Sequence, residues 1–238
     1  MEYRSFIPAT FHRREKRFTA YCTLKNGEEI TAHVRNTGRC AELLIPGTEV
    51  YLEYSPAPTR KTDYTLYMVN RGDRLINLDS QAPNKLGIEG IRSKKILLTD
   101  LDITNASFYP ERTFGNSRFD LYIETPTQSA YVEFKGVTLE EDGIVYFPDA
   151  PSLRAEKHVE EMIQAKNAGH LAYIVFIIQL GGNITQFSVN TKTQKTLEDK
   201  LVQAKNAGVH LLAFDSKIEK AKITVDAPIP IYLQGEKI

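Results

Sequence analysis

Residues 117–136 have the pattern of two apolar strands around a short polar turn, yet they carry two acids and a lysine. The strands read SRFDLYIE and SAYVEFKG, and TPTQ joins them. Side chains alternate along a strand, so Glu133 and Lys135 project from the same face of the second strand. Asp120 lies near the start of the first strand. A hairpin that must enter a core therefore brings three ionisable groups with it.

The length of the turn decides whether these groups meet. With the four-residue turn TPTQ, Glu124 lies opposite Ser129, and Asp120 then lies opposite Glu133 with the two Cβ atoms about 5 Å apart. A five-residue turn would place Phe134 opposite Asp120, and only a β-bulge would restore the cluster. The four-residue register predicts two carboxylates and one ammonium group on one face.

Two carboxylates at this spacing repel each other unless a cation joins them. Mg²⁺ or Mn²⁺ bound by Asp120 and Glu133, together with waters and phosphate oxygens, would polarise a phosphodiester and activate a water molecule. Lys135 would neutralise developing charge or position that water. A structural interpretation competes, because Glu-x-Lys on a strand is commonly a solvated ion pair and Asp before a strand is commonly a turn residue. The spacing alone favours the structural interpretation.

Composition excludes a strongly basic protein. The 238 residues contain 30 Lys plus Arg and 30 Asp plus Glu, so the net charge is zero and any nucleic-acid binding must come from local patches. Cys22 and Cys40 have no zinc-site spacing and are expected to be reduced thiols. The N-terminus lacks the apolar run of a secretory signal, and the apolar run at 171–178 is too short to cross a bilayer. We expect a cytoplasmic protein with no membrane contact.

The chain divides near residue 80. Short strand patterns punctuated by Asn-Gly, Pro-Gly and Pro predict a small β-barrel over 1–80, of the size of an oligonucleotide/oligosaccharide-binding (OB) barrel; four of about five such strands lie at 17–24, 28–34, 48–55 and 63–70. Residues 81–238 predict a mixed α/β domain in the order α-β-β-β-α-β-α-β. Its helices are expected at 83–97, 151–169 and 196–208, and its last strand at 209–215.

Within this second half the helix at 151–169 has the clearest signals. Ser152 is a helix-capping residue and Gly169 a helix-ending one. Arg154, Lys157 and His158 share one face of this helix, and its first turn offers free N–H groups to an anion. His158 would be an acid or base there, although a lone helix histidine is more often structural.

Basic residues beside aromatic ones form a second candidate site, in the barrel half. The segment FHRREKRF carries four cations, Arg13, Arg14, Lys16 and Arg17. Such interleaving suits single-stranded nucleic acid, because bases stack on rings and phosphates pair with cations; a solvated basic segment explains it equally well. Arg39, after the turn at 36–39, either contacts phosphate or pins that turn. Arg118, beside Asp120, completes the predicted nucleic-acid-binding set with Arg154 and Lys157.

Several stretches, in order and over nearly the whole chain, resemble the sugar fermentation stimulation protein (SfsA) family. They are HVRNTGRCAELLIPGTEVYL, INLDSQAPNKL, GNSRFDLYIE, YVEFKGVTL, DGIVYFPDAPSLRAEKH and NAGVHLLAF. The resemblance implies an N-terminal OB-like barrel, a C-terminal domain of the PD-(D/E)XK nuclease superfamily, DNA binding, and regulation of sugar utilisation genes. In the nuclease pattern Asp120 is the first acid, and Glu133 with Lys135 forms the E-x-K element. This moves the preference from a structural ion pair to a functional site.

The chain departs from the family pattern outside the hairpin. Arg35 stands where proline is common, and IQL at 178–180 stands where VQR is usual, which leaves Gln179 a weak candidate. Glu111 is a candidate third carboxylate or a surface charge. Two functions stay open: a DNA-binding protein with a magnesium- or manganese-dependent phosphodiesterase site, and a catalytically silent DNA-binding regulator of maltose-type sugar genes. The strand state of the DNA and the oligomeric state are also open, with a homodimer among the alternatives.

Overall fold

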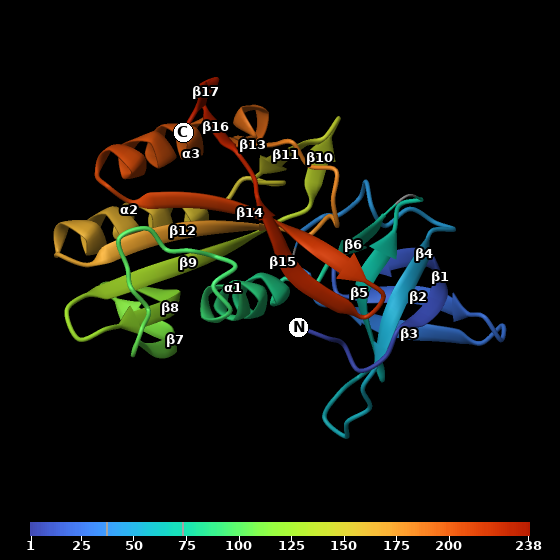
Figure 1. Cartoon of the computed structure of the whole chain (residues 1–238). Helices are drawn as coiled ribbons and strands as arrows, with labels where there is room; N and C mark the ends of the chain where they lie inside the picture. Colours follow the sequence, from blue (N-terminus) through green and yellow to red (C-terminus); the bar gives the residue numbers. More distant parts are fainter. Residues whose placement is uncertain (37, 73) are drawn as a thin grey trace.

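The structure is a computed structural model that describes residues 1–36, 38–72 and 74–238. Thr37, which belongs to the turn predicted at 36–39, and Asp73 lie outside the described residues. Figure 1 shows a β-barrel built from the first third of the chain beside a larger body of sheets and helices. No helix in the described ranges is long and apolar enough to cross a membrane.

The N-terminal part is a closed five-stranded barrel, as predicted. Antiparallel neighbours follow the order β3-β2-β1-β4-β5, the parallel pairing of β3 with β5 closes the barrel, and β6 extends it beyond β5. The strands are β1 (Ile7–Glu15), β2 (Thr19–Leu24), β3 (Glu29–Val34), β4 (Glu49–Tyr54), β5 (Tyr64–Asn70) and β6 (Leu75–Asn77). The predicted basic segment proves to be the end of β1 followed by a turn, in which Lys16 and Arg17 have φ of 48° and 62°.

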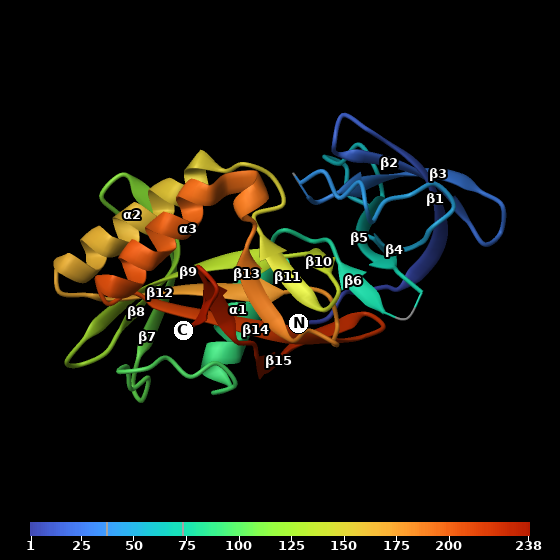
Figure 2. The same ribbon diagram turned by 90° about the horizontal axis from the view of Figure 1, so that it is seen from above.

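The larger part contains a six-stranded mixed sheet in the order β15-β14-β12-β9-β8-β7. Its centre is parallel, because β12 pairs in parallel with both β9 and β14, whereas the outer pairs are antiparallel. The strands are β7 (Ser107–Phe114), β8 (Ser117–Glu124), β9 (Ser129–Val137), β12 (Leu171–Ile178), β14 (His210–Glu219) and β15 (Lys222–Pro228). Helix α1 (Ala82–Arg92) packs on one face, and α2 (Leu153–Asn167) with α3 (Thr191–Asn206) lies over the other (Figure 2).

The predicted order of elements was incomplete. A smaller sheet, in the order β10-β11-β13-β16-β17, lies beside the large one. Its strands are β10 (Leu139–Glu141), β11 (Ile144–Phe147), β13 (Gln186–Val189), β16 (Ile231–Leu233) and β17 (Glu236–Lys237). Of these, only β11 was predicted. The others have two to four residues, too few for an alternation pattern to emerge.

Helix bounds also differ from the prediction. Helix α1 ends at Arg92 rather than continuing to 97, because the chain turns at Lys94 with φ of 60°. Helix α3 starts five residues before the predicted start, where the side chain of Asn190 accepts the N–H of Thr193 at 3.3 Å. Helix α2 has the predicted cap: the hydroxyl of Ser152 accepts the N–H of Ala155 at 3.1 Å.

Two hydrophobic clusters fill the interior. One contains Phe11 and Val34 of the barrel together with Phe176 and Phe187 of the two sheets, and it extends beneath α2 and α3. The other lies between α1 and the opposite face of the large sheet, and it includes Phe134. Apolar contact is therefore continuous from the barrel into the rest of the molecule, which fixes the relative position of the two parts.

Candidate active site and adjoining cleft

The hairpin has the predicted four-residue turn. Strands β8 and β9 pair from Glu124 opposite Ser129 to Leu121 opposite Val132. This ladder ends before Asp120, so the predicted direct pairing of Asp120 with Glu133 is not a ladder pair.

The ladder ends because the alternation of β8 is interrupted at Asp120. Phe119 and Leu121 are two residues apart, yet they belong to the hydrophobic clusters on opposite faces of the sheet. The interruption frees the Asp120 carboxylate to reach the neighbouring strand, where Oδ2 accepts the main-chain N–H of Phe134 at 2.8 Å. Oδ1 accepts the Asn84 amide of α1 at 2.7 Å. Asp120 is thereby tied to β9 and to α1.

Glu133 is held from two directions through one oxygen. Its Oε1 accepts the Lys135 ammonium at 2.6 Å and is also the hydrogen-bond partner of Nδ1 of His158 on α2. Its other oxygen, Oε2, is buried and has no hydrogen-bond partner among the described residues. Only 3% of Glu133 is exposed, so one oxygen of a buried carboxylate has no hydrogen bond to offset the free-energy cost of its burial.

The two acids have opposite pKa shifts. The pKa of Asp120 is raised to about 6: burial raises it most and the negative charge of Glu133 adds to this, while the hydrogen bond from Phe134 and the charge of Lys135 oppose both. Burial also acts to raise the pKa of Glu133, but the hydrogen bond with His158 and the charge of Lys135 outweigh it and lower the pKa overall. At neutral pH Glu133 is ionised, and the second negative charge on Asp120 is costly.

This arrangement fits a small, oxygen-liganded cation at Asp120 and Glu133. The unpartnered Glu133 Oε2 and the raised pKa of Asp120 both mark negative charge that nothing nearby neutralises in full. A hard divalent ion needs few carboxylates, because waters and substrate oxygens complete its shell. Among the described residues no set of three or more His, Cys, Asp or Glu side chains is grouped to hold a metal. The protein would therefore supply two carboxylate ligands to such an ion rather than its full set of ligands.

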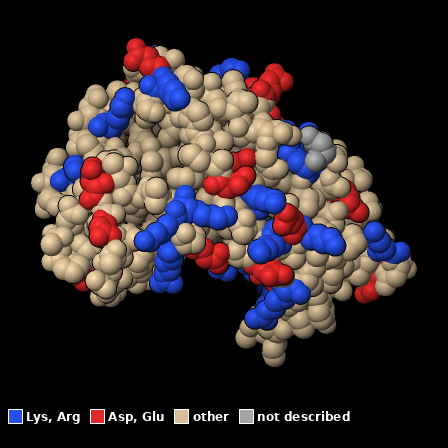
Figure 3. Space-filling view, viewed as in Figure 1, with Lys and Arg blue, Asp and Glu red and all other residues tan. Residues whose placement is uncertain are grey.

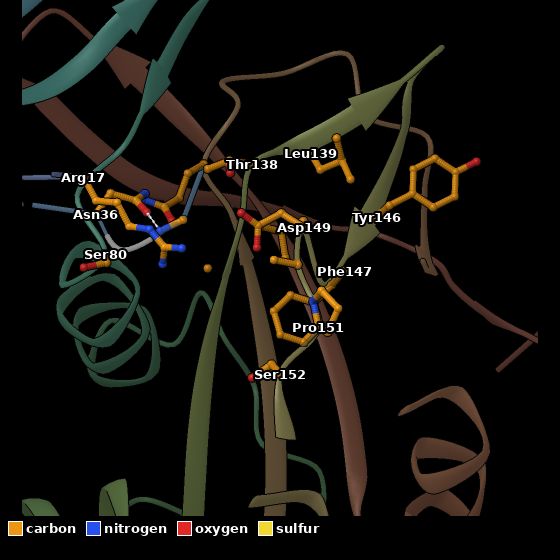
Figure 4. A pocket seen from close by; sticks show the side chains of 15 residues that line it. Arg17, Asn36, Ser80, Thr138, Leu139, Tyr146, Phe147, Asp149, Pro151 and Ser152 are labelled. Atoms are coloured by element: carbon orange, nitrogen blue, oxygen red, sulfur yellow. Dashed lines mark hydrogen bonds between the residues drawn. The ribbon is translucent and has the colours of Figure 1, made fainter. Parts of the chain in front are cut away.

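A cleft of about 350 Å³ opens between the barrel and the sheets, beside this cluster. Figure 4 shows Arg17 and Asn36 on one side of it, and Asp149, Phe147 and Pro151 on the other. The first pair comes from turns of the barrel. Phe147 is the last residue of β11, and Asp149 and Pro151 belong to the segment that joins β11 to α2.

Three elements run from this cleft to the acidic cluster. Ser80, Gly136 and Ser152 line the cleft. Asn84, Glu133 and His158 lie four, three and six residues from them along α1, β9 and α2. At helical and extended rises these steps are on the order of 10 Å or less. The cleft therefore lies within a short stretch of chain of the acidic cluster on three different elements.

Four of the eight predicted nucleic-acid-binding side chains are engaged by carboxylates, an aromatic ring or main-chain carbonyls. Arg13 pairs with Glu15 and stacks on Tyr21, with the guanidinium carbon 3.5 Å from the ring centre. Arg118 pairs with Glu111 at 3.3 Å on the exposed surface. Arg14 donates hydrogen bonds to four main-chain carbonyls, and Lys157 donates one to the carbonyl of Asn116 at 3.0 Å.

The bonds of Arg14 organise the turn at 36–39. Its guanidinium donates to the carbonyls of Asn36, Gly38 and Arg39 at 2.6, 3.0 and 2.9 Å, and also to that of Arg17. Arg14, rather than Arg39, is thus the arginine that pins this turn. Lys16, Arg17 and Arg39 are exposed, and within the described ranges their side chains make no hydrogen bond or ion pair.

Arg154 lies one turn before His158, and its Nε approaches the imidazole Nε2 at 3.4 Å. Charges of both signs are interspersed over the face shown in Figure 3, in keeping with the net charge of zero. The cations available to a polyanion are local ones, at the barrel turns and at the start of α2.

Gln179 has a role that the sequence did not reveal. Its amide nitrogen donates to Oδ1 of Asn77 at 2.7 Å and to the carbonyl of Asp79 at 3.1 Å. Tyr3 joins the same network, because it accepts the Asn77 amide at 2.9 Å and donates to Asp79 at 3.2 Å. This buried polar network links the barrel end to β12. Sequence spacing could not predict it, because hydrogen-bonded partners in it are up to 102 residues apart.

Comparison with known proteins decides the family. The family model described as "SfsA N-terminal OB domain" matches residues 13–78, and "Sugar fermentation stimulation protein RE domain" matches residues 81–222. The chain belongs to the SfsA family. A sugar fermentation stimulation protein homolog of Clostridium beijerinckii is 41% identical over 233 residues, covering 98% of this chain and 100% of the relative. One of Desulfitobacterium hafniense (strain DSM 10664 / DCB-2) is 45% identical over 223 residues, or 94% of each chain.

A solved structure has the same fold. Pyrococcus furiosus SfsA, whose structure is described as a complex with Ca²⁺, superposes with a TM-score of 0.86 at 28% identity, and the match covers 98% of each chain. The SfsA fold therefore extends over nearly the whole molecule, including both the OB barrel and the hairpin with the two acids.

Proposed function

We propose that this SfsA protein binds DNA and hydrolyses phosphodiesters with a divalent cation held by Asp120 and Glu133. One observation carries the proposal: a buried carboxylate with an unpartnered oxygen and a half-buried one with a pKa raised to about 6 lie beside a lysine near a cleft. Barrels of the OB class commonly bind oligonucleotides, which supports nucleic acid as the ligand.

The chemistry would divide among residues of this chain. Asp120 and Glu133 would hold Mg²⁺ or Mn²⁺, and the ion would supply Lewis acidity and a more acidic bound water. Asn84 and the Phe134 amide orient Asp120 through their hydrogen bonds. His158 fixes Glu133 from α2, and Lys135 is placed to offset negative charge that develops on a phosphate. The Pyrococcus furiosus structure is described as a complex with Ca²⁺, a cation that prefers oxygen ligands, and this supports a divalent-cation site in this chain.

A catalytically silent DNA-binding regulator is the alternative, and one observation favours it. Glu133 Oε1 is already occupied by both Lys135 and His158, and the described residues offer no third acidic or histidine ligand. A protein that retained this fold only for binding would look the same. The link to sugar utilisation genes belongs to this alternative.

Cleavage assays with matched variants separate the two. Plasmid and single-stranded DNA are incubated with Mg²⁺, Mn²⁺ or EDTA, and products are followed on gels. The enzyme hypothesis expects metal-dependent cleavage that falls at least about 100-fold in Asp120→Asn and in Glu133→Gln. Glu124→Gln is the control, because its carboxylate is exposed at the turn end of the same strand. DNA binding without cleavage in the wild type would leave the regulator as the function.

A further inference from the structure

Two cavities of the molecule meet at Arg17. One is the cleft between barrel and sheets, and the other is a hollow of about 410 Å³ on the barrel, lined also by Arg39, Leu44 and Pro46. Arg17 and Arg39 are both exposed, and neither side chain has a hydrogen-bond or ion-pair partner among the described residues. The two cavities are thus adjacent, and together they outline a path with exposed cations along its barrel side and the acidic cluster beyond its inner end.

The cleft is too narrow for a double helix. Its walls come into contact where Gly38 of the barrel meets Asp149: a Cβ added to Gly38 would lie 2.7 Å from the Asp149 carboxylate. The cleft volume of about 350 Å³ is at the low end of those that hold a drug-sized ligand. A duplex needs far more room, because its major groove alone is about 12 Å wide. A single nucleotide unit suits this space and a base pair does not.

The charges that line the cleft orient such a nucleotide. Arg17 and Asp149 face each other across it in Figure 4. Asp149 is exposed and makes no hydrogen bond or ion pair with any described residue. A carboxylate repels phosphate but accepts hydrogen bonds from the N–H groups of a base, as Asp and Glu do from cytosine N4. The phosphates therefore belong on the Arg17 side and a base edge on the Asp149 side.

We propose that this path takes a single unpaired strand of nucleic acid, with its phosphates along Arg39 and Arg17 and one base held in the cleft against Asp149. The proposal rests on the proposed function for its ligand class, and it adds the strand state, the route and a residue that contacts the base. Such a strand would pass Gly136 and reach the cluster at Glu133 within a few residues of β9.

The test measures fluorescence anisotropy of a labelled 12-mer single strand and of a hairpin duplex of the same sequence, with the full chain in EDTA. We expect the single strand to bind at least about tenfold more tightly. Ala150→Trp fills the cleft and should weaken single-strand binding about tenfold, whereas Ala168→Trp, at the far, exposed end of α2, should leave it unchanged. Equal affinity for duplex and single strand would overturn the proposal, as would unchanged binding by Ala150→Trp.

Asp149→Asn gives a second measurement that does not depend on a bulky side chain. If a base N–H bonds the carboxylate, the variant binds the single strand several-fold more weakly, because a charge-assisted bond becomes a neutral one. Tighter binding would show that Asp149 only repels phosphate and would overturn the placement of the base. Both binding measurements are independent of catalysis. Metal-dependent cleavage of duplex DNA without a preference for single strands would agree with the proposed function and would contradict the single-strand path.

Discussion

Nδ1 of His158 and Oε1 of Glu133 are hydrogen-bond partners, although the two residues lie 25 positions apart on different elements. The contact runs from α2 to the centre of the large sheet, so the orientation of the second acid is set by a helix that begins at the cleft. The same oxygen binds Lys135, which leaves Oε2 as the free coordinating atom. Glu133 is therefore held in one rotamer before any ligand arrives.

Loss of the imidazole should release Glu133. We expect His158→Ala to weaken Mn²⁺ binding about 10- to 100-fold, as observed when groups that orient metal ligands are removed. His158→Asn should restore part of the affinity, because its amide can donate from a similar position. Calorimetric Mn²⁺ titration of the full chain measures this, and His12→Ala on the exposed barrel surface is the control. Equal Mn²⁺ affinity in wild type and His158→Ala would show that His158 does not position Glu133.

Asp215 should make stability depend on pH. Burial raises its pKa to about 6, and the nearby Asp226 adds to this effect. A raised folded-state pKa favours the protonated form, so its contribution is present below about pH 4 and is lost as pH rises through about 6. The difference from an ordinary aspartate is at most about 3 kcal/mol at neutral pH, and solvent screening reduces it to an expected ~1–2 kcal/mol.

Asp215→Asn removes this titration. The variant should be more stable than the wild type by that amount at pH 7.5, and the advantage should vanish near pH 4. Urea denaturation at both pH values measures the difference, with the exposed Asp226→Asn for comparison. A variant less stable than wild type at pH 7.5 would mean that the ionised carboxylate is satisfied.

Gly87 permits the closest contact of α1 with the site. A Cβ at this position would lie 2.0 Å from the ring of Phe134, whose main-chain N–H binds Asp120. Alanine would add about 1 kcal/mol of helix propensity, yet we expect Gly87→Ala to destabilise the fold by about 1–3 kcal/mol, because the ring must move. Thermal and urea unfolding measure this against Lys85→Ala, which is exposed on the same helix. Stabilisation by Gly87→Ala would show that the ring has room to shift.

Arg14 and Arg39 should separate stability from binding. Arg14→Ala removes donors to four carbonyls and should cost about 2–3 kcal/mol, because a partly buried turn loses its partners. Arg39→Ala should leave the free energy of unfolding unchanged and reduce the salt dependence of DNA binding by about one phosphate contact. Paired unfolding and salt-titration experiments test both variants. A stable Arg14→Ala protein with weakened DNA binding would reverse the two roles.

Sequence patterns predicted what local rules control. The four-residue turn of the hairpin, the cap at Ser152 and the buried strand at 171–178 depend on neighbours within a few residues, and the structure has all three. Barrel closure was also within reach, because five short strands of this size have few other ways to bury their faces.

The remainder depends on distant contacts. The interruption of β8 at Asp120 changes which strand position its carboxylate meets, and no alternation pattern reports such a break. Asn84 and Gln179 look like ordinary polar residues in the sequence, and only the packing of α1 and β12 gives them partners. Arg14 was predicted as a DNA contact because the sequence gives its charge but does not indicate which main-chain carbonyls it binds.

The apolar cluster that contains both Phe11 and Phe176 has a practical consequence for producing parts of the protein separately. A fragment that ends at Ser80 would expose to water the barrel side chains that pack against the rest of this cluster, and it would leave Asn77 and Asp79 without the amide of Gln179. Half-length fragments should therefore be prone to aggregation. Exchange of barrels between relatives should succeed only when the residues that pack across the contact between barrel and sheets are exchanged together.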